Sequence, residues 1–206
     1  MNYDTLLVFM MASTALAISP GPDNIFVLTQ SISNGVKSGL ATVAGLVSGC
    51  LVHTTLLAFG ISAVIAASPK AFWGIKILGA TYLLYLAYQV YKSDAAVSAQ
   101  SEAPKKSYLA LFKQGVIMNL INPKVILFFL AFFPGALWDT SGNTVMQFYV
   151  LGATFMLVSF IIFSTIAFLA GYLSKQLKNK PGVGVFFKWL QIAVFVGIAI
   201  FILIPE

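Results

Sequence analysis

The chain has 206 residues, of which 59% are hydrophobic and only 9% are charged. Soluble domains average about 45–50% apolar and about 25% charged residues, so the composition excludes a water-soluble globular protein and indicates an integral membrane protein. The net charge of +6 comes from twelve lysines, most of them in short segments between apolar runs. This placement favours lipid headgroups over nucleic acid as the anionic partner.

Six hydrophobic runs divide the chain, near residues 5–32, 39–67, 71–91, 109–133, 146–173 and 184–204. A helix of about 20 apolar residues crosses a bilayer core of about 30 Å. Lipid cannot satisfy an open backbone, and the alternating polarity that a barrel needs is missing from these runs. We therefore predict an all-α, multi-pass membrane protein with about six transmembrane helices.

The first run has one feature of a secretion signal. Its apolar part ends in Ala15-Leu16-Ala17, which is similar to a signal-peptidase cleavage site. However, the segment before it carries Asp4 and no lysine, and the apolar pattern resumes after Asn24. We expect an uncleaved first span.

Proline and glycine interrupt this first run at Pro20-Gly21-Pro22. The two prolines have no N–H, so the carbonyls of Leu16 and Ile18 lose their usual helical partners, and Gly21 loosens the turn further. The sequence predicts a broken helix whose freed carbonyls face a new helix N-terminus inside the membrane.

The second run contains His53, the single histidine, and Cys50, the single cysteine. His53 could relay protons, or it could be a neutral histidine packed between helices. So few nitrogen and sulfur ligands indicate that there is no metal site, and we expect no cofactor. The spacings Gly35-x-x-x-Gly39 and Gly45-x-x-x-Gly49 permit close contact with another helix.

The longest polar stretch, residues 93–107, follows the third run and predicts a flexible cytoplasmic linker. It separates a first half, 1–92, from a second half, 108–206, with three runs in each. An odd number of spans per half places the second half upside down relative to the first. This is the layout of inverted-repeat transporters, which bind substrate between broken helices near the membrane midplane.

Lysines predict the orientation, because cytoplasmic loops hold the excess of positive residues. The side assigned to the cytoplasm carries Lys37, Lys92, Lys105, Lys106, Lys113, Lys175, Lys178, Lys180 and Lys188. The other side carries only Lys70 and, nearby, Lys76. We expect both termini outside the cytoplasm.

The fourth run contains a second break at Asn119-Leu120-Ile121-Asn122-Pro123-Lys124. Asn122 can cap a new helix whose first residue is Pro123, a favoured pairing. Each break therefore has a proline and a neighbouring charge, although prolines that merely kink the two helices are an alternative.

Asp23 and Lys124 are the two charges placed deep in hydrophobic runs, where a charge costs from about 2.5 to more than 10 kcal/mol. Together they would complement the ammonium and carboxylate of a net-neutral amino acid, with Asn24, Asn119 and Asn122 adding neutral hydrogen bonds. Asp23 could also load and release a proton. The alternative is structural: a helix cap and an Asp23–Lys124 ion pair that locks the two halves together.

At these residues the sequence resembles the LysE/RhtB family of amino-acid exporters. The resemblance covers most of residues 1–135 and is carried by Pro20-Gly21-Pro22-Asp23-Asn24, Gly35 to Leu40, Gly45, Gly49, His53, Lys76, Gly79-Ala80, Tyr82-Leu83, Phe112, Gly115, Asn119, Asn122-Pro123-Lys124, Phe128-Phe129 and Pro134. It implies export of amino acids or their derivatives across the bacterial inner membrane, driven by protons. It also implies six spans in two inverted halves and allows a homodimer.

We therefore expect a proton-coupled secondary exporter that works by alternating access. A passive channel, or an exporter of another small metabolite or an ion, is the alternative. An enzyme is disfavoured because the runs hold no second buried acid and no Gly-x-Ser-x-Gly elbow. No nucleotide-binding loop offers ATP as an energy source.

Overall fold

The computed structural model describes residues 3–61, 68–92, 103–139, 142–170, 172 and 181–203. Regular structure within these residues is helical, without strands, which confirms the all-α prediction. Most of the predicted linker (93–102) and Lys175, Lys178 and Lys180 lie outside the described residues.

Both halves of the chain begin with a bent helix pair. The first half consists of α1 (Tyr3–Ile18), α2 (Pro22–Asn34), α3 (Val36–Leu56) with its π-helical continuation η1 (Leu57–Ile61), and α5 (Pro69–Lys92). The second consists of α6 (Tyr108–Ile121), α7 (Pro123–Leu127) with π-helical η2 (Phe128–Phe132), the 3₁₀ turn η3 (Pro134–Ala136), α8 (Thr144–Phe168) and α10 (Pro181–Leu203). The bends are 56° between α1 and α2 and 51° between α6 and α7, so both predicted breaks are confirmed.

Several helices are suited to a membrane. Among the described residues, three are long and apolar enough to cross one, or five spans if each bent pair counts as one. The remaining predicted run corresponds to α5, which is not among those five. Its 24 residues extend over about 36 Å at 1.5 Å per residue, which is sufficient length for a sixth span.

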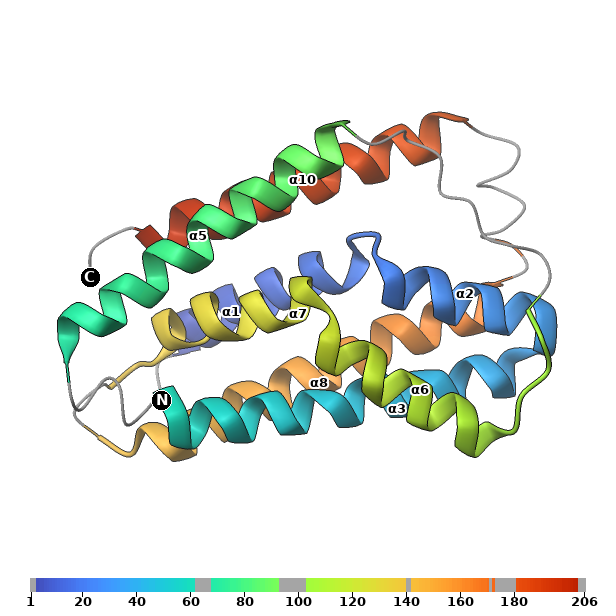
Figure 1. The fold of residues 1–206 in the computed structure, drawn as a ribbon, viewed down its shortest axis with the longest axis horizontal. Coiled ribbons are helices and arrows are strands. Elements are labelled where there is room, and N and C mark those ends of the chain that lie inside the picture. The colour runs from blue at the N-terminus through green and yellow to red at the C-terminus, as the bar shows by residue number, and fades with distance from the viewer. Residues whose placement is uncertain are drawn as a thin grey trace.

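The helices lie lengthwise in one bundle (Figure 1). The helices α5 and α10 pack side by side along one edge, α1 and α7 lie in the middle, and α3, α6 and α8 form the opposite edge. The first turns of α1 and the last turns of α10 lie at the same end of the bundle (Figure 1). An even number of crossings produces this arrangement.

Glycines bring α3 and α6 close together. A side chain on Gly45 would collide with the backbone of Phe112, and one on Gly115 would collide with the backbone of Thr42. Gly49 in turn lies against the side chain of Asn119. The close contact that the Gly45–Gly49 spacing permits is therefore present, and it places α6 against the middle of α3.

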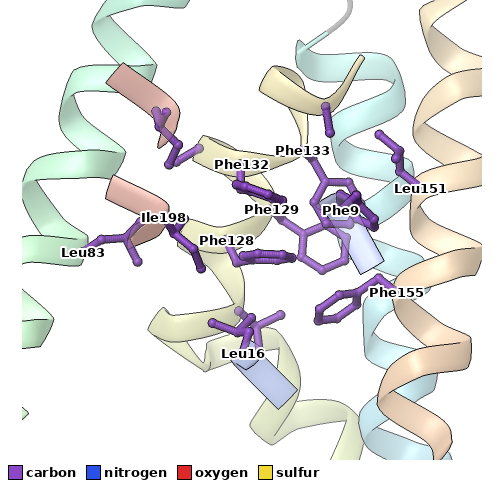
Figure 2. Packing of buried hydrophobic residues seen from close by; sticks show 14 of the residues in the cluster. Phe9, Leu16, Leu83, Phe128, Phe129, Phe132, Phe133, Leu151, Phe155 and Ile198 are labelled. Atoms are coloured by element: carbon purple, nitrogen blue, oxygen red, sulfur yellow. The ribbon is translucent and has the colours of Figure 1, made fainter. Parts of the chain in front are cut away.

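Several phenylalanines pack together within the larger of two buried hydrophobic clusters, between α1, α7–η2 and α8 (Figure 2). The ring centroids of Phe129 and Phe133 are 4.0 Å apart, and those of Phe9 and Phe133 are 4.9 Å apart. Phe155 of α8 joins the cluster at 5.2 Å from Phe129. We call this set, which also includes Phe128 and Phe132, the phenylalanine cluster.

Candidate functional site

The break between α1 and α2 is completed by side chains rather than by its own backbone. The Lys124 ammonium donates to the carbonyl of Leu16 at 3.1 Å and to that of Ser19 at 2.9 Å. The Asn24 amide donates to the carbonyl of Ala17 at 2.7 Å. Leu16 is a residue whose carbonyl was predicted to lose its partner to Pro20, and a lysine from the other half of the chain replaces that partner.

The break between α6 and α7 is capped locally. The side-chain oxygen of Asn122 accepts from the backbone N–H of Lys124 at 3.0 Å, with Pro123 at the start of α7. The backbone N–H of Asn122 also donates to the carbonyl of Asn119 at 3.1 Å. The predicted Asn122–Pro123 cap is confirmed.

The two breaks meet in the bundle interior. Asn122 donates from its side-chain amide to Asp23 Oδ2 at 2.7 Å. Asp23 is 1% exposed and Lys124 is 6% exposed, so both charges are buried as expected. Between these two described residues no direct ion pair forms, since the ammonium is bound to the carbonyls of the first break. The ion-pair alternative therefore does not describe this conformation.

A small cavity lies at this meeting point. It is lined by Asp23 and Lys124, by Cys50 of α3, by Asn119 of α6, by Phe155, Ser159 and Phe163 of α8, and by Leu16, Ala17 and Val125. The volume of the cavity that the centre of a water molecule can occupy is about 10 Å³. This is enough for roughly one water molecule. All ten residues that line the cavity are buried.

Several buried polar atoms at the breaks have no hydrogen-bond partner. They are Asp23 Oδ1, Asn24 Oδ1, Asn119 Oδ1 and Ser19 Oγ. An unpaired buried polar atom costs about 1–3 kcal/mol, so natural interiors rarely keep several of them together. These atoms are available to hydrogen-bond a polar ligand.

His53 lies behind the cavity rather than on its wall. Its Nε2 is 3.3 Å from the carbonyl oxygen of Asn119, and its ring lies 5.3 Å from that of Phe129. A carbonyl can only accept, so Nε2 carries the proton in this contact. His53 thus contacts the site through Asn119, and the packed-histidine reading fits this geometry.

Sequence reasoning missed the α8 wall and Cys50 as parts of the cavity. Cys50 accepts a hydrogen bond from the Asn119 amide at 3.4 Å. Phe155, Ser159 and Phe163 lie in a long apolar run without a recognisable motif. Lys76 of α5 is a further buried lysine, at 6% exposure.

Comparison with known proteins assigns the chain to a family. The family model of the LysE type translocator matches residues 14–205. The chain belongs to this family. It is 31% identical over 179 residues to a homoserine/homoserine lactone efflux protein of Salmonella typhimurium, covering 87% of this chain and 86% of that protein. A protein of the same description from Salmonella typhi is 32% identical, with the same coverage.

No solved structure matches the chain. The match to the family confirms the resemblance inferred from the motifs. LysE type translocators are transporters rather than enzymes, and this chain is accordingly a multi-pass membrane translocator for a small molecule.

Proposed function

We propose that this protein exports net-neutral amino acids or their derivatives from the cytoplasm in exchange for protons. One observation carries the proposal. Two opposite charges, Asp23 and Lys124, are contributed by the two helix breaks, line one cavity and are not paired with each other. The names of the Salmonella relatives make homoserine and its lactone the first substrates to test.

The roles of the two charges follow from their contacts. Asp23 Oδ1 has no partner, so it can bind either a substrate ammonium or a proton. Competition between the two for one carboxylate is a simple way to couple export to proton entry. The Lys124 ammonium has three donors, and two of them bind backbone carbonyls. A substrate carboxylate can therefore bind the third donor or replace one of the carbonyls. Asn24, Asn119 and Asn122 supply neutral hydrogen bonds around them.

Transport by alternating access needs a barrier on each side of the site. The phenylalanine cluster adjoins the cavity through Leu16 and Phe155 (Figure 2). On the other side, Phe163 packs with Ala17, Val27 and Leu46 in a second apolar cluster. With the orientation taken from the lysines, the phenylalanine cluster is the outer barrier and the second cluster is the inner one.

The order of elements supports two inverted repeats. Each half has a broken helix, a long helix and a further helix, in that order. Related halves that exchange conformations would open the site first to one side and then to the other. We place the protein in a bacterial inner membrane with both termini outside; a homodimer stays a prediction.

The test is transport by purified protein in liposomes. We expect labelled homoserine to exchange across the membrane and to be concentrated when a pH gradient is imposed. Asp23→Asn keeps an oxygen that can accept from Asn122 but cannot carry the exchanged proton. It should therefore exchange substrate without concentrating it.

Asp4→Asn, which removes an exposed acid at the start of α1, is the control and should behave as the unmodified protein. Downhill movement that no pH gradient can convert into accumulation would support the passive channel instead. Failure of every amino acid and lactone in a folded protein would reject the substrate class.

A further inference from the structure

One face of α8 forms the wall of the cavity opposite the two breaks. Phe155, Ser159 and Phe163 are spaced by four residues, so they lie on the same side of the helix, and all three line the cavity. The two phenylalanines are about 12 Å apart along the helix axis at 1.5 Å per residue. Ser159 lies midway between them.

The hydroxyl of Ser159 differs from those of Thr154 and Thr165 on the same helix. Thr154 donates to the carbonyl of Val150 at 2.9 Å, and Thr165 donates to that of Ile161 at 2.8 Å. Ser159 is 2% exposed, yet within the described part of the chain its hydroxyl makes no hydrogen bond. A buried hydroxyl costs free energy unless it is hydrogen-bonded, so Ser159 is free to bind what enters the cavity.

The charges on the cavity wall limit what can lie against α8. Asp23 and Lys124 are the only charged residues among those that line it, and the proposed function uses both for the α-ammonium and α-carboxylate. A charged substrate side chain would then be buried between phenylalanines without a counter-charge. A neutral side chain that carries one hydroxyl would meet Ser159, which can donate or accept.

We propose that Ser159 determines side-chain specificity, selecting short amino acids with a hydroxyl on an otherwise apolar side chain. The proposal rests on the export function above and deepens it. Phe155 and Phe163 limit the length of the side chain, and Ser159 recognises its hydroxyl. Amino acids with cationic or anionic side chains are rejected at this wall.

The experiment compares substrates that differ by one hydroxyl. Export of homoserine against 2-aminobutyrate, and of serine against alanine, is measured in liposomes for the unmodified protein and for Ser159→Ala. One hydrogen bond is worth about 0.5–1.5 kcal/mol. The preference for the hydroxylated member of each pair should therefore fall roughly 2- to 12-fold in the variant.

Ser164→Ala is the matched control. Ser164 is also a serine of α8, is 9% exposed, and has a buried hydroxyl without a partner, but it does not line the cavity. Its removal should leave both preferences unchanged. If Ser159→Ala does not fold, Ser159→Cys, which keeps the shape and weakens the hydrogen bond, should show the same loss.

Three results would overturn the specificity role while leaving the export function intact. They are equal export of both members of each pair by the unmodified protein, an unchanged preference in the Ser159 variants, and an equal loss in Ser164→Ala. Efficient export of lysine or glutamate would contradict the rejection of charged side chains. Export of no amino acid at all would instead reject the function on which the proposal depends.

Discussion

The two helix breaks look alike in sequence but are held in different ways. The break before α7 carries its own cap, because Asn122 accepts from the backbone two residues later. The break before α2 has Gly21 at its N-cap and no side-chain cap. Two of its carbonyls instead bind Lys124, which lies 105 and 108 residues away along the chain.

This difference suggests which break moves. A break whose backbone groups are hydrogen-bonded by neighbouring residues in the sequence can remain rigid while its surroundings change. A break that depends on a lysine from the other half must find new partners whenever that lysine binds something else. Of the four unpartnered polar atoms at the two breaks, three lie at the first, on Ser19, Asp23 and Asn24. We infer that α7 acts as the platform and that the α1–α2 break responds to the substrate.

The largest effect should come from Lys124→Met, which breaks the connection between the two halves. Methionine has a flexible apolar side chain, but it cannot donate to the carbonyls of Leu16 and Ser19. Each unpaired carbonyl costs about 1–3 kcal/mol, so the free energy of unfolding in detergent should fall by about 2–6 kcal/mol. Transport of a net-neutral amino acid should be lost.

Lys113→Met is the control for this variant, since Lys113 is an exposed lysine on α6, before the same break. It should leave stability and transport unchanged. If Lys124→Met were as stable as the unmodified protein, the first break would not depend on the lysine, and the contrast between the two breaks would disappear.

A smaller effect should appear in the reactivity of Cys50. This residue is the single cysteine of the chain, lines the cavity and is 1% exposed, so a thiol reagent should label the unmodified protein slowly. Losing even one of the two carbonyl contacts of Lys124 costs about 1–3 kcal/mol. The population in which the site is open, and hence the labelling rate, should therefore rise at least about fivefold in Lys124→Met.

Substrate bound in the cavity should protect Cys50 in the unmodified protein. The labelling must be measured well below the unfolding temperature of each variant, so that global unfolding does not contribute. A labelling rate that is the same with and without Lys124 would show that the lysine does not hold the site closed.

The sequence was most informative where the chemistry is local. A proline has no N–H wherever it lies, so Pro20, Pro22 and Pro123 predicted the breaks. The cap by Asn122 likewise depends on a residue two positions away. The burial of Asp23 and Lys124 followed from their position in hydrophobic runs. These rules act within about one helical turn and need no knowledge of the tertiary fold.

The partners across the bundle could not be predicted in the same way. A helix that is hydrophobic on all sides gives no amphipathic pattern, so nothing in residues 144–168 indicated which face of α8 lines the cavity. The positions of Ser159 and Cys50 therefore had no signal in periodicity. An Asp23–Lys124 ion pair was a reasonable alternative for opposite charges, but the ammonium binds freed carbonyls, whose direction depends on the 56° bend.

The smallest effect should come from removing the cap of the second break. This change tests whether the second break is stabilised by its own Asn122 cap. Asn122→Ala removes both the cap on Lys124 and the hydrogen bond to Asp23, whereas Asn122→Ser keeps a good N-cap but is too short to replace the amide contact with Asp23. A lost cap costs about 0.5–2 kcal/mol. Both variants lose the hydrogen bond to Asp23, so chemical unfolding in detergent should show the loss of the cap as the difference in stability between the alanine and the serine variant.

Both Asn122 variants should transport more slowly, because Asp23 loses the same donor in each. The serine variant would then separate the two functions of the Asn122 side chain. It would keep the cap at the start of α7 and lose the hydrogen bond to the Asp23 carboxylate. Equal stability of the serine and alanine variants would mean that the second break, like the first, is held by its neighbours. In that case either break could move, and the inferred asymmetry between the two halves would have to be abandoned.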